Sequence, residues 1–369
     1  MSGERERLDL VTDGGPVVDT GTSGLPLTAN CSRTLVIQTA FLGDVVLTTP
    51  LLSTLAARYG PVDVVTTPAA ASLLEGHPAI AQVVRYDKNG SARGWRGFRQ
   101  IGALLRDRGY RRVYLPHRSL RSAALALCSG ARERIGFGDS PAALTYTRRV
   151  VRPRSGHEVE RLIALAEPVA GEPPPVSLAL SAQDFAAADA WLAAHGVGPR
   201  FTALAPGSVW GTKRWPYYAE LASSLDRATV IVGGADDAPL AQAIVAAAGG
   251  KAVSAAGALN LRESAALIQR ANVLVTNDSA PLHLATAVGT PVVALFGPTL
   301  PEFGFGPRRA GDVILGHAAL ACRPCSKHGP KTCPLGHHRC MRELSVNRVV
   351  NAVAIVGSGE ESRAICPRN

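Results

Sequence analysis

The sequence predicts an α/β protein built of two similar halves, and three observations carry this prediction. Short apolar runs, typical of buried strands, alternate with helical segments between residues 34 and 115. A proline-rich break over Gly171–Pro175 interrupts this pattern, and the alternation restarts over residues 184–296. Strands that alternate with helices across short connections form a parallel sheet covered on both faces. We therefore expect two Rossmann-like sheets with a cleft between them.

The individual elements follow from the spacing of apolar residues. In the first half we expect strands at 34–37, 62–66, 83–86 and 112–115, with helices at 45–59, around 73–74 and at 98–108. In the second half we expect strands at 201–205, 229–232, 273–276 and 291–296, with helices at 184–194, 217–225, 261–269 and 281–288. The three consecutive prolines favour a stiff, extended connector between the halves.

Length and composition fit two domains of ordinary size. The chain has 369 residues, of which 46% are apolar, so it has material for two cores. We expect a disordered leader over 1–32, a first domain over 33–172, a second over 173–357 and a flexible tail over 358–369. The leader lacks the apolar core of a secretory signal, and the longest apolar runs are too short or too often interrupted to span a bilayer.

The formal charge of +10 comes almost entirely from arginine, because only five of the 39 basic residues are lysines. A basic surface favours anionic partners such as nucleic acid, acidic lipid head groups or phosphorylated sugars. A general bias toward arginine at solvated positions is the other explanation. Aromatic residues make up only 5% of the chain and no RNA-binding motif appears, so the sequence does not predict a nucleic-acid partner.

The most informative stretch joins two expected strands near residue 277. Asn277, Asp278 and Ser279 form a polar turn, and a short helix with His283 one turn in follows it. A Ser or Asp that caps a helix leaves backbone N–H groups free beside the positive helix end, which is a place for phosphate or diphosphate. His283 faces the same ligand or, alternatively, is a packed helix histidine.

This stretch, Thr-Asn-Asp-Ser-Ala-Pro-Leu-His-Leu-Ala over 276–285, resembles the heptosyltransferases of glycosyltransferase family 9. These enzymes transfer heptose from ADP-heptose onto the inner core of lipopolysaccharide. The resemblance covers roughly residues 33–355 and is greatest to members of the heptosyltransferase II type. It implies the GT-B fold, with an acceptor-binding N-terminal half and a nucleotide-sugar-binding C-terminal half. It also implies that Asp278, Ser279 and His283 contact the donor.

A second motif, Leu-Gly-Asp over 42–44, follows the first strand and opens the first helix. Ligands of open α/β sheets bind at such carboxyl ends. On the residues alone Asp44 is a helix cap, or a carboxylate that projects into the cleft. The resemblance implies the second role: Asp44 is the general base, and Gly43 beside it is on the acceptor side. A carboxylate in this place accepts the proton of the attacking hydroxyl, and we expect inversion at the anomeric carbon.

The donor half carries a third motif between strand 201–205 and the next helix. Ser208 and Lys213 lie in this loop, and a compact lysine in an arginine-rich chain indicates a position that needs a point charge. In the family the matching lysine contacts the diphosphate. A solvated loop with an incidental Lys-Arg pair is the alternative. Asp236, after Gly233-Gly234, is expected to bind a hydroxyl of the donor, with Asp237 as a competitor for that role.

The acceptor side is expected at His117–Ser122, which is similar to a basic segment of the family. Arg118 and Arg121 in it are expected to contact carboxylate or phosphate groups, unless they belong to a solvated face.

Four cysteines cluster near the C-terminus with the spacing C-x2-C-x7-C-x6-C. They are Cys322, Cys325, Cys333 and Cys340, within the segment 322–341. Three interpretations stay open: a structural zinc site, reduced or redox-active thiols that shape a loop, and disulfides. Cys31, Cys128 and Cys366 are expected to be unpaired.

Together these features predict an inverting, metal-independent glycosyltransferase that uses ADP-heptose and an inner-core lipopolysaccharide acceptor. We expect it at the cytoplasmic face of the inner membrane, held peripherally against anionic lipid by basic residues. Two alternatives stay open. One is a family 9 transferase for another nucleotide sugar, and the other is a nucleotide-sugar-binding protein that has lost catalysis.

Overall fold

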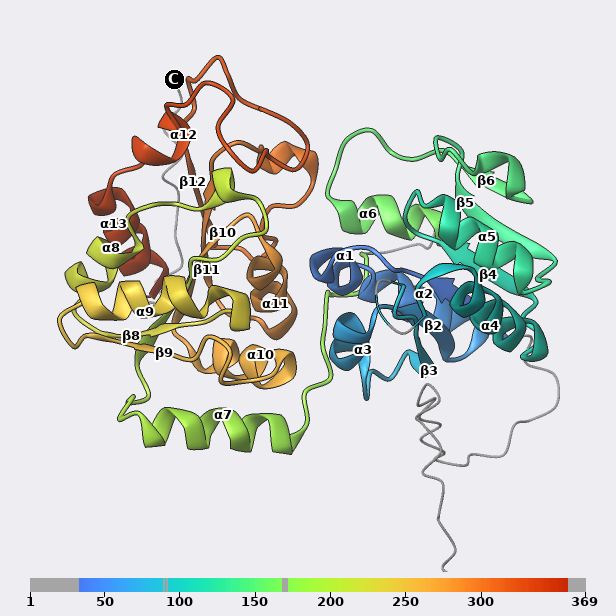
Figure 1. The fold of residues 1–369 in the computed structure, drawn as a ribbon, viewed down its shortest axis with the longest axis horizontal. Coiled ribbons are helices and arrows are strands. Elements are labelled where there is room, and N and C mark those ends of the chain that lie inside the picture. The colour runs from blue at the N-terminus through green and yellow to red at the C-terminus, as the bar shows by residue number, and fades with distance from the viewer. Residues whose placement is uncertain (1–32, 89, 91, 168–171, 358–369) are drawn as a thin grey trace, which may run out of the picture.

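The structure of the chain, a computed structural model, describes residues 33–88, 90, 92–167 and 172–357. Two parallel six-stranded sheets with flanking helices lie side by side (Figure 1). This arrangement confirms the α/β fold with two Rossmann-like halves. The predicted leader over 1–32, the predicted tail over 358–369 and the first residue of the proline-rich break lie outside the described residues.

The N-terminal sheet has the parallel strand order β3-β2-β1-β4-β5-β6. Its strands are β1 (Thr34–Ile37), β2 (Val62–Thr66), β3 (Ile80–Arg85), β4 (Arg112–Leu115), β5 (Glu133–Phe137) and β6 (Arg148–Val150). Its helices are α1 (Leu42–Leu47), α2 (Thr49–Tyr59), α3 (Pro68–Leu74), α4 (Gly94–Asp107), α5 (Leu120–Cys128) and α6 (Glu158–Ile163). Val36 enters the core on one face, whereas Leu35 and Ile37 enter the core on the other. Because both faces of β1 are buried, this strand is an almost uninterrupted apolar run.

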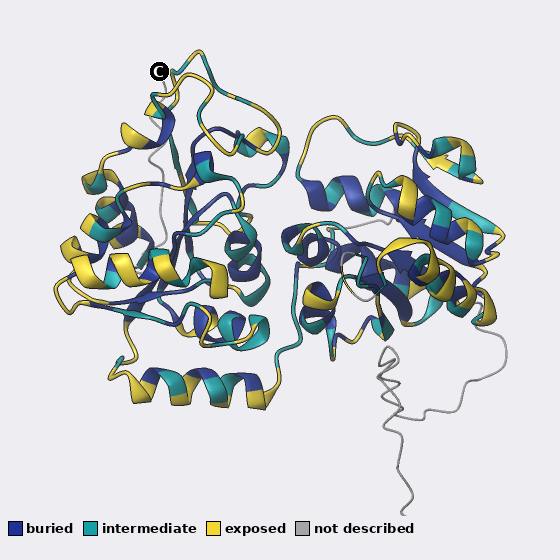
Figure 2. Cartoon of the chain, viewed as in Figure 1, coloured by how far each residue is buried: buried dark blue, intermediate teal, exposed yellow. Residues whose placement is uncertain are grey.

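The C-terminal sheet has the parallel order β12-β11-β10-β7-β8-β9. Its strands are β7 (Phe201–Ala205), β8 (Ala228–Ile231), β9 (Ala252–Ser254), β10 (Val273–Asn277), β11 (Val292–Phe296) and β12 (Val313–Gly316). Its helices are α7 (Ala182–Ala194), α8 (Tyr218–Ser224), α9 (Ala238–Ala247), α10 (Leu261–Arg270), α11 (Ala280–Val288), α12 (Arg339–Arg342) and α13 (Val346–Gly357). Figure 2 shows buried strands beneath helices whose outer faces are exposed. No helix within the described ranges is long and apolar enough to cross a membrane.

The helix expected over residues 45–59 is two helices, and this expectation was wrong. α1 ends and α2 begins at Thr48, which is the C-cap of one and the N-cap of the other. Pro50 lies in the first turn of α2, where its missing N–H is tolerated, but inside one continuous helix it would remove a hydrogen bond. The Thr48 hydroxyl donates to the carbonyl of Asp44 (2.7 Å) and accepts from Gln38 (3.0 Å). The break leaves α1 as a separate short helix that carries Asp44.

The two halves meet through helices that face each other across the gap between the sheets (Figure 1). α1 contacts α11, and α3 contacts α10. Val46, Leu47 and Leu73 of the N-terminal half share one buried apolar cluster with Leu282 and Ala285 of the C-terminal half. Burial of these side chains stabilises the contact between the halves.

A second contact between the halves is made by the start of α6. The backbone N–H of Glu158 donates to the carbonyl of Gly304 (2.8 Å), and the Arg161 guanidinium donates to the carbonyl of Phe303 (2.6 Å). The His157 ring lies 3.0 Å from the carbonyl oxygen of Gly306. Gly304 has a φ of +98°, and a β-carbon there would lie within 3.1 Å of three polar atoms of the α6 segment. Glycine is therefore required for this close approach.

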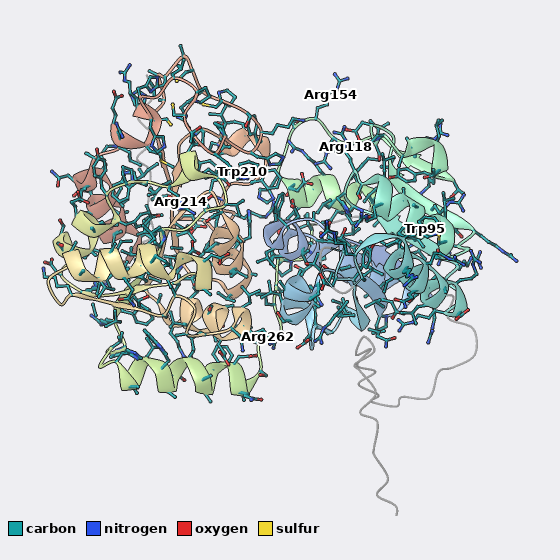
Figure 3. All side chains as sticks on the ribbon, viewed as in Figure 1. Trp95, Arg118, Arg154, Trp210, Arg214 and Arg262 are labelled. Carbon is teal, nitrogen blue, oxygen red and sulfur yellow. The ribbon has the colours of Figure 1, made fainter. Side chains whose placement is uncertain are left out.

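Arg262 makes the third contact, below the other two (Figure 3). From the start of α10 its guanidinium donates to the carbonyls of Ser72 (3.2 Å) and Glu75 (2.9 Å) in the N-terminal half. It also pairs with Asp184 of α7 at 2.7 Å. Both side chains of this pair are mostly buried, so one guanidinium joins α7, α10 and the end of α3.

Replacing Arg262 by Gln should destabilise the chain by about 3 kcal/mol, because it leaves Asp184 as a buried charge without its partner. Urea unfolding followed by circular dichroism measures this loss. Arg270→Gln is the matched control: Arg270 forms the same kind of pair with Asp189, but with both side chains about half exposed, so a change below about 1 kcal/mol is expected. Equal effects of the two variants would contradict the role given to Arg262.

Candidate active site

A cavity of about 210 Å³ lies between the two halves. It is bounded by the start of α1, the loops after β7, β10 and β11, and part of the cysteine-rich segment. Its lining residues are Phe41, Leu42, Gly43, Asp44, Ser208, Val209, Trp210, Lys213, Asp278, Ser279, Ala280, His283, Leu300, Phe303, Phe305, Lys327 and His328. The structure thus brings seven predicted site residues to one place: Gly43, Asp44, Ser208, Lys213, Asp278, Ser279 and His283.

Asp44 stands in the first turn of α1 and has two structural roles there. Asp44 is not the N-cap residue, which is Phe41; it is the third residue of the helix, and its carboxylate accepts a hydrogen bond from the backbone N–H of Phe41 (3.3 Å). The same side chain lines the cavity, so the projecting reading holds. Burial and the nearby Glu158 carboxylate raise the pKa of Asp44 to about 6, against the opposing effects of the Phe41 N–H, Arg152 and Lys213.

Gly43 lies at a close contact between the two halves. A β-carbon there would lie 2.5 Å from Cδ2 of the His283 imidazole, so any larger residue would push α1 away from α11. His283 is buried, and burial lowers the pKa of its imidazole to about 4. The ring is therefore neutral at physiological pH and acts as a hydrogen-bonding group, not as a cation.

Lys213 lies at the end of a 3-10 turn, Gly211–Lys213, and is buried. Its ammonium donates to the carboxylate of Asp278 (2.6 Å) and to the backbone carbonyl of the same residue (3.0 Å). The Thr299 hydroxyl donates to the same carboxylate oxygen at 2.7 Å. Asp278 therefore orients Lys213 and offsets its charge, a role that the sequence did not predict.

Asn277, which precedes Asp278, holds the Lys213 loop in place. Its side-chain oxygen accepts from the backbone N–H of Trp215 and the hydroxyl of Tyr218, both at 3.2 Å. Its amide nitrogen donates to the carbonyl of Pro206 (2.8 Å). Asn277 is fully buried, so without it the N–H of Trp215 and the carbonyl of Pro206 would lose these partners, whereas the Tyr218 hydroxyl also donates to the carbonyl of Ala205 (3.3 Å). The Asn-Asp-Ser turn and the Lys213 loop are one hydrogen-bonded unit.

Ser279 is the N-cap residue of α11, but its side chain makes no capping hydrogen bond. Pro281 has no N–H, and the N–H of Leu282 donates to the carbonyl of Ser279 (3.1 Å). The N–H groups that remain at the start of this nine-residue helix are those of Ser279 and Ala280, which both line the cavity. Ser208 stands opposite, in the loop after β7, where its hydroxyl accepts from the backbone N–H of Trp210 (3.3 Å). Uncapped N–H groups and a lysine beside a short glycine-containing loop form a site for phosphate oxygens.

The structure does not bring Asp236 into the cavity. Asp236 is exposed, whereas its neighbour Asp237 caps the turn after β8 by accepting from the N–H of Gly234 (3.2 Å). A β-carbon on Gly207 would lie 2.3 Å from the Asp237 carboxylate. Asp237 thus lies against the loop that carries Ser208, and of the two candidates it is the one next to the donor motif.

Arg118 and Arg121 also lie outside the cavity lining, at the start of α5. Arg118 pairs with Asp139 at 3.3 Å, and both side chains are about half exposed. Arg121 donates to the backbone carbonyl of Lys88 (3.3 Å), and the Lys88 ammonium donates to the carbonyl of Thr39 (2.6 Å). A basic margin therefore extends from the cavity along the carboxyl ends of β1, β3 and β4.

The four clustered cysteines are free thiols. Cys325 donates to the carbonyl of Cys322 (3.4 Å), and Cys333 accepts from the N–H of His338 (3.4 Å). In the part of the chain that the structure describes, no three or more His, Cys, Asp or Glu side chains are arranged to hold a metal ion. The zinc and disulfide interpretations therefore do not describe this structure. The segment is shaped instead by hydrogen bonds of Arg323 to the carbonyls of Phe296 and Thr299, both at 3.0 Å.

Several lining residues were not expected from the sequence. Leu300, Phe303 and Phe305 form an apolar wall after β11, where no polar motif marks them. Glu158 acts on Asp44 from a different element, so no spacing in the sequence connects the two. Phe303 is also a partner of α6, so the apolar wall and the contact between the halves share one loop.

Comparison with known proteins agrees with this geometry. Residues 98–336 match the family model described as glycosyltransferase family 9 (heptosyltransferase). The chain is 30% identical over 300 residues to lipopolysaccharide heptosyltransferase 2 of Escherichia coli, which covers 73% of this chain and 84% of that protein. It is 33% identical over 322 residues to lipopolysaccharide heptosyltransferase 1 of Pseudomonas aeruginosa. This match covers 82% of this chain and 87% of that protein.

Solved structures share the fold. A family 9 glycosyltransferase from Veillonella parvula superposes with a TM-score of 0.79 at 23% identity, covering 90% of this chain and 99% of that one. The E. coli ADP-heptose lipopolysaccharide heptosyltransferase II superposes with a TM-score of 0.73 at 24% identity. The superposition covers 89% of this chain and 100% of that one. The two facing parallel sheets are thus those of the GT-B fold, and the chain belongs to glycosyltransferase family 9.

Proposed function

We propose that this glycosyltransferase transfers heptose from ADP-heptose to the inner core of lipopolysaccharide, with inversion at the anomeric carbon. One observation carries the mechanism: Asp44 of the N-terminal half faces Lys213, Asp278 and Ser279 of the C-terminal half across a single cavity. The choice of sugar and acceptor is supported by the relatives, which are named as lipopolysaccharide heptosyltransferases.

In this proposal Asp44 is the general base. Its carboxylate accepts the proton of the acceptor hydroxyl as the oxygen attacks the anomeric carbon of the donor sugar. A pKa of about 6 leaves the carboxylate ionised at pH 7 but more basic than an ordinary aspartate, which favours proton transfer. Attack from the side opposite the diphosphate inverts the anomeric configuration as the bond to the phosphate oxygen breaks.

The departing diphosphate is stabilised by the C-terminal half. The bond to the sugar breaks with its electron pair on a phosphate oxygen, next to the Lys213 ammonium and the first N–H groups of α11. These groups are held in place before the reaction, by Asp278 and Asn277, so little reorganisation is needed. We propose that this set of protein groups does the work without a catalytic metal.

Replacing Asp44 by Asn should lower the rate of transfer by about 10² to 10⁴-fold. In the wild type the rate should fall below a pH near 6, as the carboxylate becomes protonated. Glu158→Gln should move this acid limb to lower pH, because it removes a negative charge that raises the pKa of Asp44. A product-release assay over pH 5–8 measures both effects, with Asp107→Asn on the exposed side of α4 as the control. Unchanged transfer in the Asp44 variant would contradict the mechanism.

The Asp44→Asn variant should also be more stable than the wild type. A carboxyl group whose pKa is raised on folding, from 3.8 to about 6, opposes folding once it ionises, fully so above pH 6. Asn removes this cost, so Asp44→Asn should gain up to about 3 kcal/mol at pH 7.5. The gain should shrink as the pH falls below 6 and vanish only well below 3.8, where Asp44 is protonated in the unfolded chain as well as in the folded one. Thermal unfolding at several pH values tests this, and an equal Tm at pH 7.5 would be evidence against a raised pKa.

The donor can be identified by its effect on stability. A true donor stabilises the fold by mass action, so ADP-heptose should raise the Tm more than UDP- or GDP-sugars do. Transfer to core acceptors with no heptose or one heptose then distinguishes the first from the second addition. A larger shift with another nucleotide sugar would favour a family 9 transferase of different specificity. Binding of ADP-heptose without turnover would favour a protein that has lost catalysis.

We propose further that the enzyme works at the cytoplasmic face of the inner membrane and that α4 contacts the lipid. Trp95 near its start is 70% exposed and stacks on Phe98 with ring centroids 5.6 Å apart. Arg93, Arg96 and Arg99 around it are exposed, and the described residues offer them no salt bridge. An exposed tryptophan among unpaired arginines suits an anionic bilayer surface. α4 follows β3, and Figure 3 shows Trp95 on the side of the N-terminal half that faces away from the C-terminal half.

Vesicle sedimentation tests this surface. The wild type should bind phosphatidylcholine vesicles that contain phosphatidylglycerol, and binding should weaken with salt. Trp95→Ala and Arg96→Gln should each weaken it, the latter by about 1 kcal/mol. Arg270→Gln, on the other half, serves as the control. Binding that is equal for all variants would rule out α4 as the contact.

A further inference from the structure

The cysteine-rich segment belongs to the active-site cavity. Lys327 and His328, which lie between its second and third cysteines, line the same cavity as Asp44 and Lys213. Both side chains are exposed, so they are open to a ligand that enters between the halves. In the sequence the cysteines are the conspicuous feature of this segment. In the structure it is the turn between Cys325 and Cys333 that borders the cavity with Asp44 and Lys213.

This turn is anchored on both sides to the loops that build the donor site. The N–H of Cys325 donates to the carbonyl of Pro298 (2.9 Å), just after β11. Thr212, the neighbour of Lys213, donates from its N–H to the carbonyl of Pro330 (3.4 Å), and its own carbonyl lies 2.7 Å from the His338 ring. The segment thus supports the Lys213 turn from outside while presenting residues 326–329 to the cavity.

Gly329 allows the turn to lie this close. Its φ is +75°, and a β-carbon there would come within 2.9 Å of the Pro298 ring and 3.2 Å of the Thr212 hydroxyl. Only glycine adopts this conformation without strain in this space. The glycine backbone therefore allows the preceding residues, 327 and 328, to reach the cavity.

His328 joins the turn to both halves. Its ring stacks on Trp210 of the C-terminal half, with centroids 6.2 Å apart and planes 17° apart. It also lies 6.4 Å from the ring of Phe41, which precedes α1 in the N-terminal half. Trp210 is labelled in Figure 3. The ring therefore bridges the loop that leads to Lys213 and the residue that caps the Asp44 helix.

Lys327 supplies the cavity with a positive charge that is not paired with a carboxylate of the described residues. Among the lining residues the lysines are Lys213 and Lys327. The charge of Lys213 is offset by Asp278 at 2.6 Å, so this pair has no net charge to place against a diphosphate. The Lys327 ammonium makes no hydrogen bond or ion pair with a described residue. In a chain with only five lysines, both cavity positions have a compact, flexible point charge in place of arginine.

We propose that Lys327 is a second cation for the donor diphosphate, and that His328 holds it over the cavity by packing between Trp210 and Phe41. When the bond between sugar and phosphate oxygen breaks, the electron pair stays on the diphosphate. Lys327 keeps its proton and donates charge-assisted hydrogen bonds to the oxygen atoms of the diphosphate. This inference rests on the proposed function, because it assigns a residue to the diphosphate of the same donor.

Isothermal titration with ADP and AMP tests it, since AMP lacks the β-phosphate. Lys327→Gln should weaken ADP binding about tenfold to hundredfold and leave AMP binding nearly unchanged. Lys327→Arg, which keeps the charge, should restore most of the affinity. Lys331→Gln is the matched control, because Lys331 is exposed in the same segment but does not line the cavity. An unchanged Tm of each variant shows that the fold is intact.

Each outcome decides between explanations. Equal ADP affinity of Lys327→Gln and wild type would overturn the inference. If that variant raised only the KM of the acceptor, Lys327 would serve an anionic acceptor group and the inference would again be wrong. A wild type that binds ADP but no ADP-heptose would refute the proposed donor while the diphosphate contact could still be measured. A wild type that binds neither would refute both.

Discussion

The contact between Gly43 and the His283 imidazole determines how the two halves work together. Asp44 belongs to one sheet and the Lys213–Asp278 pair to the other, so their separation depends on how closely α1 approaches α11. A missing side chain at residue 43 allows the ring to lie against the helix backbone. Every other contact between the halves, from α6 to Arg262, is compatible with this approach and helps to maintain it. The reacting groups are thus positioned by packing and not by their own hydrogen bonds across the cleft.

Burial sets the electrostatics of the site. The same removal from water raises the pKa of Asp44 and lowers that of His283, so both groups are less charged than they would be in solvent. Lys213 stays buried because the carboxylate and the backbone carbonyl of Asp278 both accept hydrogen bonds from its ammonium. The result is a cavity of low net charge. Lys327 and the α11 N-terminus are the parts of this cavity whose positive charge is not already offset.

Much of the fold could be predicted because buried parallel strands leave a clear trace in the sequence. The strands 34–37, 62–66, 112–115 and 201–205 have the bounds expected from their apolar runs. The helix break at Thr48 was missed because apolar spacing continues through it, and only Pro50 marks the new start. β5, β6, β9 and β12 were not predicted, since they are short or mixed with charged residues. Edge position and partial exposure make such strands hard to recognise.

For the site, sequence reasoning identified residues within motifs and missed those that act from elsewhere. Asp44, Lys213, Asp278 and His283 lie in recognisable turns, and the structure gathers them. Glu158 and Lys327 come from elements with no obvious chemical pattern, and only the tertiary fold places them near Asp44. The sequence left both Asp236 and Asp237 as candidates, and the structure places Asp237 beside Gly207 and leaves Asp236 exposed.

The α6 segment has a consequence for how the two halves can be exchanged between relatives. α6 is joined to the N-terminal sheet through β6, yet its first residues bind the backbone of Gly304 and Phe303, next to the wall of the donor cavity. A chimaera joined at the proline-rich break would carry one partner of this contact from each parent. The N-terminal half is therefore not an independent module. Its last helix forms part of the contact with the C-terminal half, and recombination has to preserve both sides of that contact.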